Sequence, residues 1–177
     1  MPQSGRPQPG EYPAYYGSYL SLIAGEDPLP ALEAQAAELQ SLAGLPEDQA
    51  GHRYAEGKWS VREVLGHLID AERICGYRAM RIARGDQTPL PGYESHTYAA
   101  TAGHDACPFA ELVEELVSLR RSHLLLFRHL PAEAWTRRGV MNENPASTRA
   151  LAFFMAGHTA HHLAILRDRY GIAGAPR

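Results

Sequence analysis

The stretch LAFFMAGHTAHHLAILRDRY, residues 151–170, decides the fold of this chain. Because an α-helix advances about 100° per residue, its apolar and histidine side chains gather on one side of a single long helix. The members of that stripe are Leu151, Phe154, Met155, His158, His162, Ile165, Leu166 and Arg169. The helix is predicted to begin after Ser147 and to end near Tyr170, before Gly171.

Two histidines within this helix form a candidate metal-binding pair. His158 and His162 lie one turn apart on the helix and about 40° apart around its axis, so both rings can bind one ion. Burial beside Phe153 and Phe154 would leave unpaired polar rings at a cost, which favours metal binding over a role as hydrogen-bonded core residues. His161 points about 100° away from His162, which leaves it as a supporting residue, an interhelical contact or an alternative ligand.

Three further helices are predicted upstream of this one. They span about residues 29–42, 60–84 and 109–130, each with apolar residues at helical spacing. Ser60 and Glu63 have the spacing of a capping box at the start of the second. The sequence shows no pair of strands with alternating apolar residues, so four helices of this length predict an all-α four-helix bundle rather than an α/β fold.

Two long connections join these helices, at residues 86–107 and 131–146. A connection as long as the first is usually functional or carries short structure of its own. Its tyrosines Tyr93 and Tyr98 are candidates to cover a pocket, and the alternative is that the segment only packs over the end of the bundle. His96 and His104 also lie in it and are the two remaining histidines with a route to the metal site.

The third ligand has to come from another helix, and His67 is the best candidate because it lies inside the second one. Taken alone, His67 is more typical of a hydrogen-bonded core residue. Asp70, three residues later, is the candidate base or hydrogen-bond acceptor, although a surface ion pair with Arg73 or Arg78 explains it equally well. The HExxH motif of zinc proteases is absent, since threonine stands directly after His158.

Composition narrows the class of protein. The 177 residues are 45% hydrophobic, with a formal net charge of −3 and no dense run of lysine and arginine, so a nucleic-acid partner is not expected. No apolar run approaches the roughly 20 residues that cross a bilayer, so no membrane partner is expected. The two cysteines form no motif, and the proline-rich N-terminus is unlike a signal peptide. We therefore expect a cytoplasmic protein.

The domain organisation expected is simple. Residues 1–27 are predicted to form an N-terminal arm packed on or beside the domain, because they combine prolines with several tyrosines. Residues 28–171 form the helical bundle, and residues 172–177 form a C-terminal tail.

The motifs Gly57-Lys58-Trp59-Ser60, Gly66–Arg73 and Gly157–His162, in this order and placement, resemble the DinB-like (DinB/YfiT) superfamily. The resemblance covers nearly the whole chain after the N-terminal arm. It implies an up-down-down-up four-helix bundle whose divalent metal ion, commonly zinc or nickel, is held by the residues at positions 67, 158 and 162. It also implies a homodimer in many members.

The function implied by this resemblance is looser, because a shared fold does not fix a reaction. Some relatives are transferases or isomerases that use low-molecular-weight thiols such as bacillithiol or mycothiol, and others are named as metal-dependent hydrolases. Three protein ligands leave an open coordination position for a thiol or a water. We therefore expect a metal-dependent thiol S-transferase acting on a small molecule in detoxification or stress. The alternatives are a metal-dependent hydrolase and a non-enzymatic metal-binding stress protein.

Overall fold

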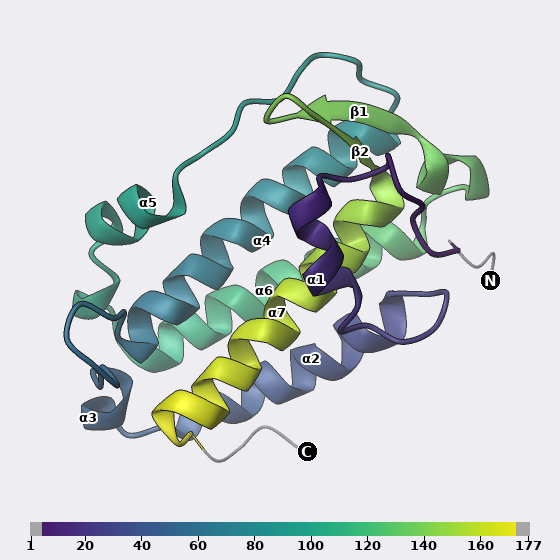
Figure 1. The fold of residues 1–177 in the computed structure, drawn as a ribbon. Coiled ribbons are helices and arrows are strands. Elements are labelled where there is room, and N and C mark those ends of the chain that lie inside the picture. The colour runs from purple at the N-terminus through teal and green to yellow at the C-terminus, as the bar shows by residue number, and fades with distance from the viewer. Residues whose placement is uncertain (1–4, 173–177) are drawn as a thin grey trace.

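A computed structural model of the chain describes residues 5–172. Four long helices dominate it and confirm the predicted four-helix bundle. They are α2 (Leu29–Ser41), α4 (Val61–Ala83), α6 (Phe109–Arg128) and α7 (Thr148–Tyr170). In Figure 1, α4 and α6 run in one direction while α2 and α7 run in the other, which is the up-down-down-up order. Residues 1–4 of the predicted arm and 173–177 of the predicted tail lie outside the described residues.

Short elements fill the connections. Ahead of the bundle lie η1 (Ala14–Tyr16) and α1 (Gly17–Leu20). Between α2 and α4 lie η2 (Leu42–Gly44) and α3 (Glu47–Ala50). The long connection from α4 to α6 carries α5 (Ser95–Ala102) and η3 (His104–Ala106), and η4 (Ala132–Thr136) follows α6. None of the described helices combines the length and the apolar character needed to cross a membrane.

The ends of α4 and α7 follow from local sequence signals. The Ser60 hydroxyl accepts a hydrogen bond from the Glu63 backbone N–H, and the Glu63 carboxylate accepts one from the Ser60 N–H, so the predicted capping box is present. Ser147 caps α7 in the same way by accepting from the Ala150 N–H. Gly171 then ends α7 in the left-handed conformation, with φ of 67°.

One sequence expectation was wrong: the chain does contain a strand pair. Strands β1 (Arg138–Met141) and β2 (Asn144–Ser147) form an antiparallel hairpin inside the connection between α6 and α7. Its two loop residues, Asn142 and Glu143, both have positive φ, as a type I′ turn requires. The strands are only four residues long, β2 contains Pro145, and the turn lacks the usual glycine, so the sequence pattern was too weak to predict them.

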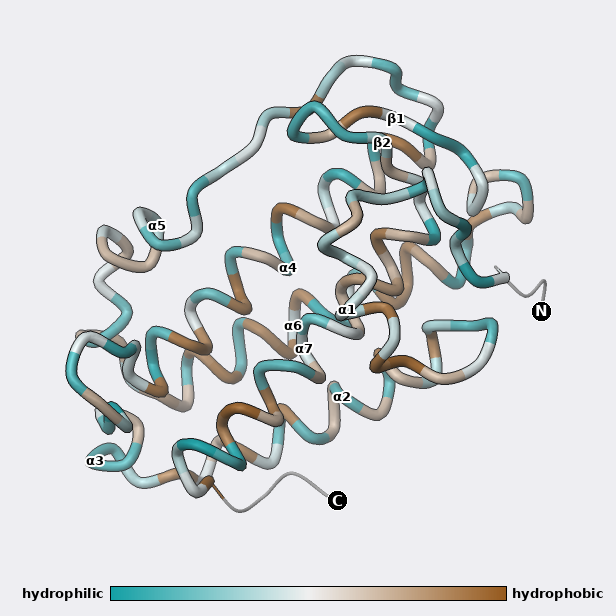
Figure 2. Tube along the Cα trace, viewed as in Figure 1, coloured by the Kyte–Doolittle hydropathy of each residue, from teal (hydrophilic) through white to brown (hydrophobic). Residues whose placement is uncertain are grey.

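The apolar core is divided into two halves along the bundle. One half gathers the N-terminal parts of α4 and α6 with the C-terminal parts of α2 and α7. The other half gathers the opposite ends of these helices together with α1 and the hairpin. Figure 2 shows hydrophobic stretches recurring along the long helices with hydrophilic ones between them, as amphipathic packing requires. Buried polar residues lie between the two halves at mid-height.

Arg120 of α6 is the centre of this polar layer and is fully buried. Its guanidinium donates to both carboxylate oxygens of Glu72 on α4, at 2.8 and 2.9 Å. It also donates to the Gln35 side chain on α2 and to the Thr159 hydroxyl on α7, each at 2.8 Å. His123 adds a contact of 3.1 Å to Glu72. One network therefore connects all four long helices at the level where α7 carries its histidines.

The N-terminal segment packs along α7. A Cβ built on Gly157 would lie 2.1 Å from the Tyr19 carbonyl oxygen, so the close approach of α1 to α7 requires a glycine there. Tyr16 is buried, and its ring stacks on Phe154 with centroids 3.8 Å apart. Further towards the N-terminus, the buried Glu11 carboxylate accepts hydrogen bonds from Ser147 and Arg149 at the start of α7.

Candidate metal centre

The structure brings together the three histidines that the sequence singled out. His67 lies in the second turn of α4, and His158 and His162 lie one turn apart in α7. The His158 Nε2 is 3.0 Å from the His67 Nε2 and 3.2 Å from the His162 Nε2. All three rings are buried. Because α4 and α7 run antiparallel and in contact, residues 67 and 158 reach the same level of the bundle.

The donor set fits one divalent ion. Two nitrogens bound to one tetrahedral zinc at the usual bond length of about 2.0–2.1 Å are about 3.3 Å apart, close to the separations seen here. One ligand atom from each histidine can be chosen so that all three lie within 4.8 Å of one another. Three neutral Nε2 atoms that face one another cannot all be paired by hydrogen bonds, whereas a shared metal ion would satisfy all of them.

The environment keeps these imidazoles unprotonated, which is the form that binds metals. Burial lowers the pKa of His67 to about 4 and that of His162 to about 3. Burial, followed by the neighbouring rings of His162 and His67, lowers the pKa of His158 well below its usual range. All three rings are therefore neutral at pH 7 without a metal ion.

The outer side of the triad is incompletely satisfied. The His162 Nδ1 is buried and has no hydrogen-bond partner within residues 5–172. Metal-binding histidines commonly donate their second N–H to an acceptor, so His162 departs from the usual pattern. His161, left open by the sequence, lies outside the triad, lines the adjoining cavity and contacts the Tyr19 ring with centroids 5.3 Å apart.

Aromatic rings surround the triad. The Trp59 ring lies against His67 and against His96, with centroids 5.0 and 5.1 Å apart. On the other side Phe154 stacks on His158, with centroids 5.2 Å apart and planes 19° from parallel. Tyr19 meets the His158 ring edge-on at 5.5 Å. These rings fix the orientation of the imidazoles and shield the site from bulk water.

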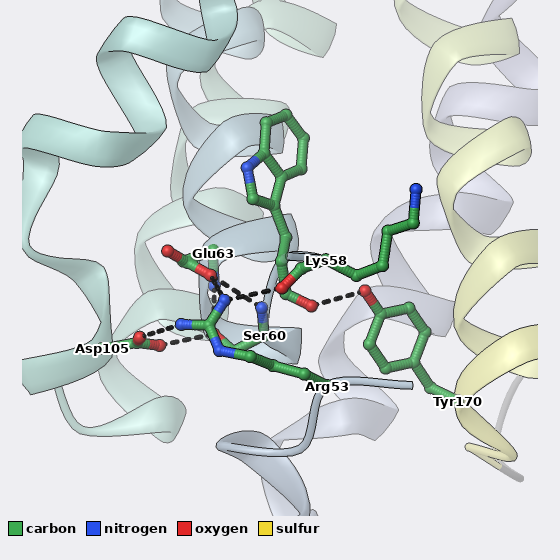
Figure 3. A network of polar contacts seen from close by, with 7 residues as sticks. Arg53, Lys58, Ser60, Glu63, Asp105 and Tyr170 are labelled. Carbon is green, nitrogen blue, oxygen red and sulfur yellow. Dashed lines mark hydrogen bonds and ion pairs between the residues drawn. The ribbon is translucent and has the colours of Figure 1, made fainter. Parts of the chain in front are cut away.

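A polar network at the start of α4 holds the segment that carries Trp59 (Figure 3). Arg53 pairs with Glu63 and with Asp105 of η3, and Ser60 also donates to Asp105. The Tyr170 hydroxyl, at the end of α7, donates to the Trp59 carbonyl oxygen at 2.7 Å. The backbone at Trp59 is therefore tied to both helices that supply the histidines.

A cavity of about 370 Å³ opens next to the triad, a size typical of small-molecule sites. Besides the three histidines it is lined by α1 and η1, by the connection between α4 and α6, and by the hairpin. The main lining residues are Tyr15, Tyr16, Tyr19, Trp59, Cys75, Arg78, Tyr93, His96, Met141, Phe154 and His161. The connection therefore lines the site through Tyr93 and His96, whereas Tyr98, the other tyrosine expected to cover a pocket, does not line this cavity.

Other candidates from the sequence lie elsewhere. Asp70 is not among the described residues that line this cavity, and its titratable neighbours are His104, Arg73 and Glu115. Burial raises the pKa of Asp70. Tyr98 lines a separate cavity, and His104 packs against Gly66 and is not among the described residues that line the cavity beside the triad.

Several lining residues were missed from sequence alone, and Tyr19 and Arg78 are two of them. Tyr19 precedes the bundle and reaches the site only through the packing of α1 on α7. Arg78 lies eleven residues after His67, which places both on the same side of α4 after three turns. That spacing was the one available signal for Arg78.

Comparison with known proteins agrees with this fold. A sequence model described as the DinB superfamily matches residues 31–166, which is most of the chain. The protein therefore belongs to the DinB superfamily.

Two relatives show how far the likeness extends. A Bacillus pumilus (strain SAFR-032) protein described as a "putative metal-dependent hydrolase" is 25% identical over 130 residues, covering 70% of this chain and 71% of its own length. The solved structure of YfiT from Bacillus subtilis, described as a "probable metal-dependent hydrolase with an unusual four-helix bundle topology", matches with a TM-score of 0.73. That match covers 85% of this chain and 91% of the other at 21% identity, and it establishes the fold alone.

Proposed function

We propose that this protein is a divalent-metal-dependent enzyme that transfers a low-molecular-weight thiol to an electrophilic small molecule, with the metal, zinc or nickel, held by His67, His158 and His162. The observation that carries the choice of a thiol is the lining of the cavity. No aspartate or glutamate is among the described residues that line it. Hydrolysis would therefore have to proceed without a carboxylate base beside the attacking water, whereas a thiol has a pKa of about 8.5 and ionises far more readily than free water.

Each part of the site has a role in this reaction. A bound divalent metal would supply Lewis acidity, which lowers the pKa of a coordinated thiol or water. The three neutral imidazoles hold the metal, and the walls of Trp59, Tyr19 and Phe154 provide apolar surface for the electrophile. Tyr93 and His96, from the connection between α4 and α6, close the cavity over the reacting groups.

The reaction balances without a further reactant. The thiol loses its proton to solvent, and its sulfur forms a bond to an electrophilic carbon of the acceptor. A leaving group such as chloride departs with the electrons of the bond that breaks. The test is chloride release from a chloro-aromatic acceptor by protein loaded with zinc or nickel, with and without bacillithiol or mycothiol. A rate of release that rises above the protein-free rate only when both metal and thiol are present supports the proposal. A rate no faster than that of the same thiol and acceptor without protein contradicts it.

Metal-dependent hydrolysis is the second candidate, and the descriptions of the two relatives favour it. His96 and His161 line the cavity, so either is placed to accept a proton from an attacking water. Ester cleavage by the metal-loaded protein without thiol, reduced in His96→Gln or His161→Gln, would support hydrolysis over thiol transfer. A protein that binds metal but performs neither reaction would favour a non-enzymatic metal-binding role.

A further inference from the structure

Arg78 is a buried cation without an anionic partner. Its side chain lines the cavity beside the triad, yet the residue is only 5% exposed. The guanidinium donates to the Pro91 carbonyl oxygen at 2.5 Å, contacts the Met141 sulfur at 3.8 Å and lies over the Tyr93 ring at 5.7 Å. These partners are neutral, and no carboxylate within residues 5–172 forms an ion pair with it. Burying an unpaired charge is costly, so this arrangement needs an explanation.

The acidic groups around Arg78 do not neutralise it. Burial raises the pKa of the Cys75 thiol to about 12 and raises those of the Tyr16 and Tyr93 hydroxyls, so all three stay protonated at neutral pH. Glu72, one turn before Cys75, is already paired with Arg120 and His123. Arg78 is thus the one Lys, Arg, Asp or Glu side chain among the described residues that line the cavity.

The position of Arg78 relative to the triad suggests what it binds. Both His67 and Arg78 face the cavity from α4, and eleven residues of helix place their backbones roughly 16 Å apart along the axis. Helical side chains incline towards the N-terminus of their helix, which is the direction of His67 from Arg78. One cavity is therefore lined by the candidate metal-binding triad, by a single cation set apart from His67 along α4, and by aromatic rings.

We propose that Arg78 binds an anionic group, a carboxylate in particular, of the same small molecule whose donor atom reaches the metal. A planar guanidinium matches a carboxylate through two parallel hydrogen bonds, and the buried setting strengthens them. That this donor atom is a thiol sulfur rests on the proposed function. Binding by Arg78 defines the thiol substrate as an anionic one, with its carboxylate some distance from its sulfur.

The test compares mercaptocarboxylates with their neutral amides. Mercaptopropionate, mercaptohexanoate and mercaptoundecanoate, each beside its amide, are titrated into zinc-loaded and metal-free protein by calorimetry. In the zinc-loaded protein the best carboxylate should bind at least about tenfold more tightly than its amide, as expected for hydrogen bonds to charged groups. The preference for carboxylate over amide should depend on the length of the mercaptocarboxylate, because its sulfur must reach the metal while its carboxylate reaches Arg78.

Variants assign the preference to Arg78. Arg78→Met should reduce the carboxylate-to-amide ratio to near one, while Arg78→Lys, which retains the charge but not the planar fork, should keep a reduced preference. Arg84→Met is the matched control, because it removes one exposed arginine from the end of the same helix. Thermal unfolding of each variant shows whether it folds, and Arg78→Lys keeps the test open if Arg78→Met does not.

The outcomes separate this inference from the proposed function. Two results would overturn the role of Arg78. One is tight binding of the thiols to the zinc-loaded protein with a carboxylate-to-amide affinity ratio near one. The other is a preference for the carboxylates that survives in Arg78→Met. A carboxylate preference in the metal-free protein that zinc does not strengthen would support Arg78 as an anion site but contradict the thiol function. A second cavity of about 270 Å³ also reaches Arg78, and binding there would show no dependence on zinc. Binding by no ligand to either form would contradict both.

Discussion

Arg120 carries its charge into the centre of the bundle, where Glu72 neutralises it through two hydrogen bonds. Loss of one partner would leave an uncompensated buried charge. We expect Glu72→Met or Arg120→Met to lower the free energy of unfolding by about 3–5 kcal/mol, and the double variant to lose less than the sum. The exposed Arg73–Glu115 pair joins the same two helices, so Arg73→Met should cost at most about 1 kcal/mol. Urea unfolding measures all four, and equal losses for Arg120→Met and Arg73→Met would contradict this account.

Glu11 gives the stability a defined pH dependence. Burial would raise its pKa, but the hydrogen bonds from Arg149 and Ser147 outweigh that effect and lower it from 4.5 to about 2. The lowered pKa means that ionised Glu11 stabilises the fold fully above pH 4.5, and that this contribution is lost as the pH falls towards 2.

Glu11→Gln should therefore lower the free energy of unfolding at pH 7 by about 1–3 kcal/mol. The difference from the wild type should shrink as the pH falls from 4.5 towards 2. The exposed Glu56 provides the control, and Glu56→Gln should change little at any pH. Chemical denaturation across this range is the measurement, and a difference that stays constant with pH would rule out the proposed ionisation.

Sequence reasoning at the residue scale found the candidate ligands better than the residues around them. His158 and His162 were recognisable because helical spacing alone places them together. Trp59 and Tyr19, which contact the triad, come from segments whose approach depends on tertiary packing. Asp70 was chosen for its closeness to His67 in sequence, but three residues along a helix also rotate a side chain by about 60°, and the structure places it by α6 and η3.

At the scale of elements, helices were predicted best where capping residues mark their ends. Ser60 with Glu63, Ser147 and Gly171 define ends of α4 and α7 through contacts between near neighbours, which a sequence records directly. The hairpin depends on Asn142 and Glu143 adopting positive φ, which neither residue type requires. Short α1 and α3 have too few residues for a periodic pattern, so they are defined by their packing.

The contact between α1 and α7 gives a prediction at this scale. Gly157→Ala would force its Cβ against the Tyr19 carbonyl oxygen, so α1 should move away and the free energy of unfolding should fall by about 1–3 kcal/mol. Amide hydrogen exchange of residues 14–23 should become faster. Gly17→Ala, in α1 itself, meets nothing within 4 Å and should be neutral or slightly stabilising. Unchanged exchange in Gly157→Ala would show that α1 does not depend on this approach.

At the scale of the whole molecule, the packing of the bundle brings residues that are far apart in the sequence into one site. Antiparallel packing of α4 on α7 sets His67 beside His158, and the polar layer around Arg120 fixes the level at which the four helices meet. The number of long helices and their approximate lengths were predictable from periodicity. The direction of α6 relative to α4 was predicted by family resemblance, because the long connection between them permits either direction.

The binding of one metal ion by the three histidines is the central claim, and metal content tests it most directly. Purified protein, incubated with zinc or nickel and then desalted, is analysed for metal beside the triple variant His67→Ala, His158→Ala, His162→Ala and the control His129→Ala, which removes an exposed histidine. The account predicts close to one ion per chain in the wild type and the control, and almost none in a triple variant that remains folded. A wild-type protein that stays free of both metals, or a folded triple variant that retains its ion, would contradict it.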